Sequence, residues 1–207
     1  MKCNDENPNS FNGVAFSGGG AKGVGHLGVV SALGDKGLNR LTEVSGASAG
    51  SIIGLCVALG MTSTEIINFS KEQKIELKQN ILKEQIQNLI TKKLESIDPD
   101  MNKDEAKELT FSQLSKIRDK KPDKDIKDLK IAASWVSKSH NIKQEICLSN
   151  ESAPHMPIYL AVLASAALPL VMDRVKIAER DYCNYFEDGI KEVLKEITVI
   201  VCIQFFT

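Results

Sequence analysis

Between residues 11 and 60, short apolar runs alternate with segments in which apolar residues recur at helical spacing. The run 13–17 is followed by three glycines, which predicts a buried strand that stops at a turn. A helix over 21–36 should follow, and Gly37 is placed to end it. The same order returns with a strand over 41–45 and an apolar helix over 49–59. Buried strands alternating with helices predict a mostly parallel sheet covered by helices, which is an α/β fold.

The middle of the chain mixes apolar and charged residues. From 66 to 97 the apolar positions recur at helical spacing among lysines and glutamates, which predicts a long amphipathic helix, either continuous or broken. The helix should end at 98–100, and Thr110 is placed to cap a short helix that reaches Ile117. The remaining predicted elements are a hairpin of strands over 130–136 and 143–149, an apolar helix over 157–167 and a last buried strand over 197–206.

The amphipathic segment has two interpretations. We favour a solvated cover that packs one apolar stripe on the core. The alternative is a lid, or a helix lying on an anionic membrane with its lysines near the headgroups. The balancing glutamates weaken that alternative, because equal numbers of opposite charges attract an anionic surface poorly.

Length and charge narrow the class of protein. The 207 residues, 43% of them hydrophobic and 26% charged, predict a single domain over 11–207 with a charged helical cover at about 65–128. The 26 basic residues against 27 acidic ones leave no excess of positive charge for a phosphate backbone. We therefore expect no nucleic acid as a partner.

Cysteine use and hydropathy indicate a cytoplasmic protein. The five cysteines are widely spread and odd in number, which favours reduced, buried thiols over a disulfide framework or a zinc site. The first ten residues hold acids and amides where a signal peptide needs an apolar stretch. Two uncharged segments, 44–64 and 152–172, are too rich in glycine, serine or proline for bilayer spans and should be core.

The sharpest chemical feature is the G-x-S-x-G sequence Gly46-Ala47-Ser48-Ala49-Gly50, between a predicted strand and a predicted helix. A serine on such a turn exposes its hydroxyl at the helix N-terminus, where the helix dipole stabilises developing negative charge. The competing interpretation is a turn of small residues that lets strand and helix pack closely.

A second glycine-rich turn, Gly18-Gly19-Gly20-Ala21-Lys22-Gly23, also joins a predicted strand to a predicted helix. A P-loop is disfavoured because the lysine is not followed by serine or threonine. A dinucleotide-binding G-x-G-x-x-G fingerprint does match, with Glu43 about 20 residues further on. The third interpretation is an oxyanion hole, with glycine amides facing the carbonyl oxygen that Ser48 would attack.

The histidines do not supply an evident partner for Ser48. His26 lies on the first predicted helix, His140 in a turn and His155 beside prolines, whereas a hydrolase triad would place its histidine late in the chain. A carboxylate is therefore the expected base. Asp188, in Glu187-Asp188-Gly189, is the best-placed candidate.

Together these motifs resemble the patatin-like phospholipase family. That family combines a G-G-G-x-[RK]-G loop, a G-x-S-x-G elbow and a later D-G acid, which correspond here to 18–23, 46–50 and Asp188. A further family segment, A-S-x-A-x-P, is matched by 164–169. With Lys22 in the glycine loop, the chain resembles the branch of the family that contains bacterial effector phospholipases.

The resemblance implies a three-layer α/β sandwich and a lipid acyl hydrolase of phospholipase A or lysophospholipase type. Ser48 would attack the ester carbonyl, Asp188 would accept its proton and later activate water, and the loop at Gly18, Gly19, Gly20, Lys22 and Gly23 would hold the oxyanion and substrate. This scheme needs no metal and no organic cofactor. The implied partners are an acyl-ester substrate such as a phospholipid, a membrane surface contacted transiently from the cytoplasm, and a protein activator. An effector would in addition be delivered into a host cell.

One departure from the family's sequence pattern leaves two other functional hypotheses open. Family members usually read D-G-G or D-G-A, whereas this chain has Ile190 after Asp188-Gly189. A catalytically impaired member that acts as a binding module is therefore a second hypothesis. The dinucleotide-binding enzyme is the third.

Overall fold

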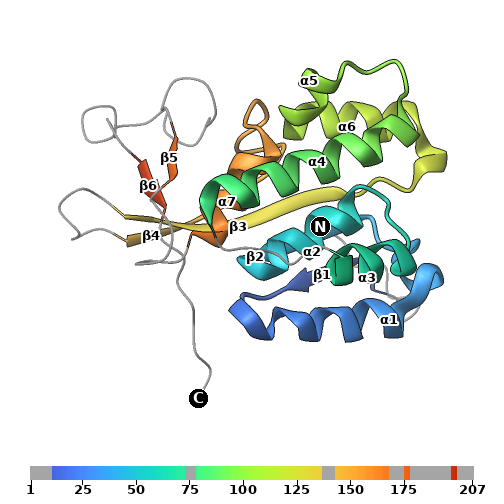
Figure 1. The fold of residues 1–207 in the computed structure, drawn as a ribbon, viewed down its shortest axis with the longest axis horizontal. Coiled ribbons are helices and arrows are strands. Elements are labelled where there is room, and N and C mark those ends of the chain that lie inside the picture. Colours follow the sequence, from blue (N-terminus) through green and yellow to red (C-terminus); the bar gives the residue numbers. More distant parts are fainter. Residues whose placement is uncertain (1–10, 73–77, 137–142, 168–174, 178–196, 200–207) are drawn as a thin grey trace, which may run out of the picture.

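The computed structural model describes residues 11–72, 78–136, 143–167, 175–177 and 197–199, and Figure 1 shows their arrangement. Strands β1 (Gly13–Phe16), β2 (Glu43–Ala47) and β3 (Asp128–Val136) pair in parallel and form the part of the sheet predicted from the sequence. The other pairs are antiparallel. They involve β4 (Lys143–Leu148), β5 (Val175–Ile177) and β6 (Ile197–Val199).

The sheet order is β1-β2-β3-β6-β5, with β4 also paired to β3. The hairpin of β3 and β4 confirms the prediction for 130–149. The predicted last strand is present over Ile197–Val199, and its residues 200–206 lie outside the described ones. The short strand β5 was not predicted, because three residues give no measurable alternation of apolar and polar positions.

Helices follow the first two strands as the apolar pattern predicts, but the first helix does not end at Gly37: it is kinked at Gly34 and reaches Leu38. The first glycine turn begins a 3-10 helix, η1 (Gly20–Val24), that leads into α1 (Gly25–Leu38), and α2 (Ala49–Ala58) follows β2. The described residues of the amphipathic segment contribute the first two of the later helices. The later elements are α3 (Ser63–Glu72), α4 (Gln79–Ile97), α5 (Lys103–Lys107), α6 (Phe111–Lys120), the 3-10 helix η2 (Pro122–Lys124) and α7 (Ile158–Ala166).

Helices α2 and α7 pack on one face of the sheet. The parallel register sets Val14, Val44 and Leu129 side by side, so their side chains share a face. A methyl group added at Gly54 of α2 would lie 3.6 Å from the side chain of Val44, which identifies that face as the one α2 covers. Helix α7 packs against both α2 and β3. All residues of α2 from Gly50 to Ala58 are buried, so this helix is the centre of the core.

Helix α4 buries one stripe and exposes its charges, as the favoured interpretation of the amphipathic segment requires. Its buried residues are Leu82, Ile86, Leu89, Ile90, Leu94 and Ile97. This spacing of three and four residues places them on a single face. Because that stripe is already packed on the core, it is not free to enter a membrane.

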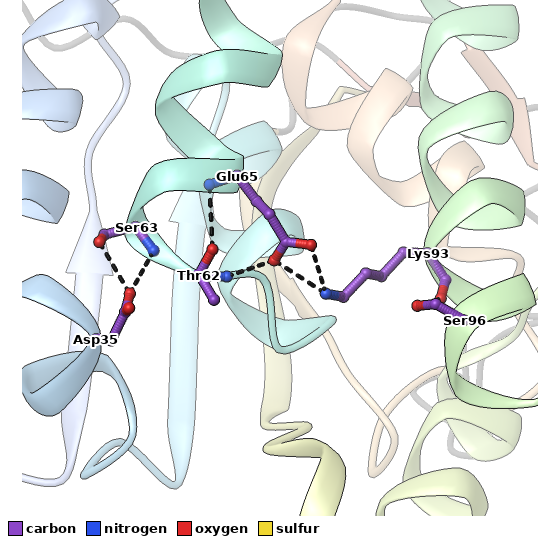
Figure 2. Close-up of polar contacts among 6 residues, drawn as sticks. All are labelled: Asp35, Thr62, Ser63, Glu65, Lys93 and Ser96. Atoms are coloured by element: carbon purple, nitrogen blue, oxygen red, sulfur yellow. Dashed lines mark hydrogen bonds and ion pairs between the residues drawn. The ribbon is translucent and has the colours of Figure 1, made fainter.

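Figure 2 shows how the start of α3 is fixed to α1 and α4. The carboxylate of Asp35 in α1 accepts hydrogen bonds from the backbone N–H and the hydroxyl of Ser63, at 2.7 and 2.8 Å. The Glu65 carboxylate accepts the Thr62 N–H at 2.7 Å, and the Thr62 hydroxyl accepts the Glu65 N–H at 3.1 Å. The ammonium of Lys93 in α4 lies 3.0 Å from the Glu65 carboxylate. Polar contacts thereby link α3 to α1, and α4 to α3.

The predictions for Thr110 and for the cysteines had different outcomes. Thr110 caps α6 as expected: its hydroxyl accepts the Gln113 N–H at 3.2 Å, and the Gln113 side chain accepts the Thr110 N–H at 2.8 Å. Cys56 is buried, and burial raises the pKa of its thiol to about 12, which makes it unreactive. Cys147 is exposed, so the prediction of a buried thiol is wrong there. The reason is its place opposite Ala132 on β3, at a position of the sheet that is itself exposed.

None of the described helices combines the length and the apolar character that a bilayer span requires. The two segments tested from the sequence, 44–64 and 152–172, contribute instead the buried helices α2 and α7.

Candidate active site

Ser48 occupies a strained turn between the end of β2 and the start of α2. Its backbone has φ 51° and ψ −124°, a conformation that residues with a Cβ rarely adopt. Such strain is associated with functional positions and costs about 1–3 kcal/mol. The residue is only 4% exposed and sits at the N-terminus of a buried helix. The strained strand-to-helix turn lies where G-x-S-x-G predicts a nucleophile elbow. The residue is buried, however, so the prediction of an exposed hydroxyl is wrong, and the role of Ser48 as a nucleophile stays a prediction.

The two flanking glycines are required by close backbone contacts. A Cβ added to Gly46 would overlap the carbonyl group of Gly50. A Cβ added to Gly50 would overlap the carbonyl groups of Phe16 and Ser17, at the end of β1. The G-x-S-x-G sequence thus lets the elbow turn tightly and brings α2 against the strand that leads into the glycine loop.

The glycine loop lies beside the elbow. A Cβ on Gly18 would be 3.5 Å from the Cβ of Ser48, and one on Gly23 would be 2.6 Å from the Cβ of Ala49. Gly20 has φ 49°, which favours glycine. Within the loop the Lys22 N–H donates to the Gly19 carbonyl at 2.9 Å. The structure therefore brings together the two motifs that the sequence separates by about 25 residues.

The register of β1 and β2 argues against the dinucleotide-binding interpretation. A fingerprint of that kind needs an acidic residue near the glycine turn, at the carboxyl end of the second strand. Glu43 instead pairs with Gly13 at the other end of these strands. Its carboxylate binds the ammonium of Lys130 at 2.8 Å.

The described histidines are His26 and His155. His26 donates a hydrogen bond from Nε2 to the carbonyl of Ser17 at 2.8 Å, and its ring meets the edge of Phe16 at 5.4 Å. His155 lies in an exposed turn before α7. Over the residues that the structure describes, neither ring is hydrogen-bonded to Ser48. His140 lies outside these residues.

Ser165 contacts the elbow from a distant part of the chain. Its hydroxyl oxygen accepts the backbone N–H of Ser48 at 2.8 Å and donates to the carbonyl of Ala132 at 2.6 Å. The A-S-x-A-x-P pattern contains Ser165, but the pattern gives no indication of this partner. Asp188, the predicted base, lies outside the described residues together with Ile190, so its pairing with Ser48 stays a prediction.

Solved structures share this fold. The type III effector protein ExoU has a TM-score of 0.60 and 21% identity, covering 75% of this chain and 40% of that one. VipD from Legionella pneumophila has a TM-score of 0.59 and 21% identity, covering 83% of this chain and 45% of that one. The heterodimeric complex ExoU-SpcU from Pseudomonas aeruginosa gives a TM-score of 0.56 and 19% identity, with coverage of 75% and 36%. The chain thus spans less than half the length of these proteins.

A family model described as patatin-like phospholipase matches residues 14–190. The chain belongs to this family, and the predicted patatin-like α/β fold is confirmed. No curated protein is similar enough in sequence to be matched.

Proposed function

We propose that this chain is a lipid acyl hydrolase of phospholipase A or lysophospholipase type, with Ser48 as its nucleophile. The observation that carries the proposal is the strained Ser48 elbow beside the glycine loop, in a chain that belongs to the patatin-like phospholipase family. A small-residue turn without chemistry would not need a non-glycine residue at φ 51°.

In the proposed reaction the Ser48 hydroxyl oxygen bonds to the ester carbonyl carbon while Asp188 takes its proton. Collapse of the tetrahedral intermediate breaks the bond to the alcohol, which leaves with a proton, and the acyl group remains on Ser48. Asp188 then removes a proton from water, and attack by that water releases the fatty acid. Since a free aspartate has a pKa of about 3.9, Asp188 must be desolvated and close to Ser48 to act as a base.

The glycine loop is proposed to stabilise the oxyanion through its backbone N–H groups. The support is the approach of Gly18 to the Ser48 side chain and the N-terminal end of α2 at the same place. Lys22 is exposed on this loop and is proposed to contact the substrate.

Substrate lipids lie in membranes, so we also propose peripheral membrane contact. The exposed large hydrophobic side chains among the described residues are Phe11, Val24 and Val29. Val24 is 69% exposed and directly follows the glycine loop, which places apolar surface next to the proposed active site. A protein activator and delivery into a host cell are proposed by analogy with ExoU, which is described as a type III effector and as a complex with SpcU.

The test is fatty acid release from phospholipid vesicles and from a short-chain ester by wild type, Ser48→Ala and Asp188→Asn. We expect hydrolysis by wild type only, with both variants folded. Turnover that persists in Ser48→Ala contradicts the proposal. An inactive wild type that gains activity in Ile190→Gly identifies the impaired family member instead, because the glycine would let the Asp188 loop approach Ser48.

A further inference from the structure

Ser165 holds the elbow by a hydrogen-bond bridge between two elements. It lies in α7, is fully buried, and is separated from Ser48 by 117 positions in the sequence. Its hydroxyl connects the Ser48 N–H, at 2.8 Å, with the Ala132 carbonyl of β3, at 2.6 Å. Ala132 is the residue of β3 that pairs with Ala47, immediately before Ser48. The bridge therefore spans from the elbow to the neighbouring strand.

The chemistry of the two partners fixes the direction of both hydrogen bonds. A carbonyl oxygen only accepts, so the Ser165 proton must point to Ala132. The lone pairs that remain then accept the Ser48 N–H. Because its proton is engaged and its side chain is fully buried, Ser165 is not itself suited to attack a substrate.

The other polar backbone group of Ser48 is held as well. Its carbonyl accepts the Ser51 N–H at 2.9 Å and the Ser51 hydroxyl at 2.6 Å. Both polar backbone groups of the strained residue are thus engaged by buried partners. A strained backbone conformation persists only where the surrounding structure holds it in place. Of these hydrogen bonds to the Ser48 backbone, the one with Ser165 comes from outside the β2–α2 segment.

We propose that Ser165 is a positioning residue that holds the Ser48 elbow in its active conformation by binding the Ser48 amide and the Ala132 carbonyl. One consequence concerns the oxyanion. With its amide turned toward Ser165, Ser48 cannot donate that N–H to a substrate oxygen, so this donation must come from other groups such as the glycine loop. The inference rests on the proposed function of Ser48.

A matched control exists elsewhere in the chain. The Ser152 hydroxyl, also buried, accepts the Ser149 N–H at 3.0 Å and donates to the Cys147 carbonyl at 2.6 Å. These bonds stay within the end of β4 and the turn that follows it. Ser152→Ala thus removes the same two kinds of hydrogen bond as Ser165→Ala, without touching the elbow.

The experiment measures kcat and KM on a soluble ester, and the rate of labelling by a fluorophosphonate probe, for wild type, Ser165→Ala and Ser152→Ala. All are compared at a temperature where circular dichroism shows each protein folded. We expect Ser165→Ala to lower kcat and the labelling rate by about 10- to 100-fold with KM within about 2-fold of wild type, because small misplacements of a nucleophile have effects of this size. Ser152→Ala should keep wild-type rates.

If Ser165→Ala does not fold, Ser165→Cys takes its place, since the thiol keeps a side chain of similar shape but is a weak donor and acceptor. Wild-type rates in the folded Ser165 variant, or an equal loss in Ser152→Ala, overturn the inference and leave Ser48 as nucleophile. Absence of labelling in wild type, or labelling that persists in Ser48→Ala, contradicts the proposed function and this inference together.

Discussion

Replacing Ser48 by glycine should stabilise the protein relative to Ser48→Ala, although both changes remove the proposed nucleophile. At φ 51° and ψ −124° a residue with a Cβ is strained, whereas glycine adopts this conformation freely. Relief of about 1–3 kcal/mol of strain is offset by the larger entropy that glycine gains in the unfolded chain, about 0.5–1 kcal/mol. We therefore expect Ser48→Gly to exceed Ser48→Ala by about 1 kcal/mol in free energy of unfolding.

The assay is urea unfolding of the two variants, followed by circular dichroism, with thermal melting as a second measure. For a chain of this size 1 kcal/mol corresponds to about 2–4 °C in Tm. The control is Ala49→Gly, one residue further on in the first turn of α2, where helical geometry makes glycine unfavourable by up to about 1 kcal/mol. If Ser48→Gly is no more stable than Ser48→Ala, the elbow stores no strain, and the structural argument for Ser48 as the nucleophile is wrong.

Three further predictions concern the surroundings of the site and the cover. Gly50→Ala should destabilise the protein by about 1–3 kcal/mol because the new methyl meets the Phe16 carbonyl, whereas Gly28→Ala, in open space on α1, should be neutral or stabilising in the same denaturant titration. Partial burial would raise the pKa of Glu65, but the Thr62 N–H and the Lys93 ammonium outweigh burial and lower it. The resulting stability, about 0.5–1 kcal/mol after solvent screening, is present above the unfolded pKa and should be lost as the pH falls from about 5 through the folded pKa. A Glu65→Gln variant that shows the wild-type loss over that pH range would contradict this assignment. His26→Gln should keep most of the esterase activity, and a loss as large as that of Ser48→Ala would indicate a catalytic histidine.

The sequence predicts well those features that depend on neighbours in the chain. The apolar runs and glycines around β1, β2 and α2 predict the strand, the elbow and the helix because tight turns and buried strands require these residue types. The capping of α6 by Thr110 is local in the same sense. The residues that determine each of these elements lie within a few positions of it in the sequence.

Features that depend on distant contacts could not be predicted in this way. The bond of Ser165 to the Ser48 amide joins residues 117 positions apart, and no local pattern distinguishes such a hydroxyl from one that merely caps its own helix. The exposure of Cys147 follows from the sheet face that β4 presents, which depends on its pairing with β3. The distance in sequence between Glu43 and the glycine loop is compatible with a dinucleotide-binding site. Only the pairing of Glu43 with Gly13 shows that it lies at the opposite end of the strands from that loop.

The central claim is that Ser48 is an activated nucleophile, and mapping a fluorophosphonate adduct tests it most directly. Wild-type protein is treated with the probe, digested and analysed by mass spectrometry, alongside Ser48→Ala and the buried-serine control Ser152→Ala. The account predicts one adduct, on the peptide that contains Ser48, in wild type and Ser152→Ala, and none in Ser48→Ala. An adduct on a different serine, or no adduct in a folded wild type, would contradict it.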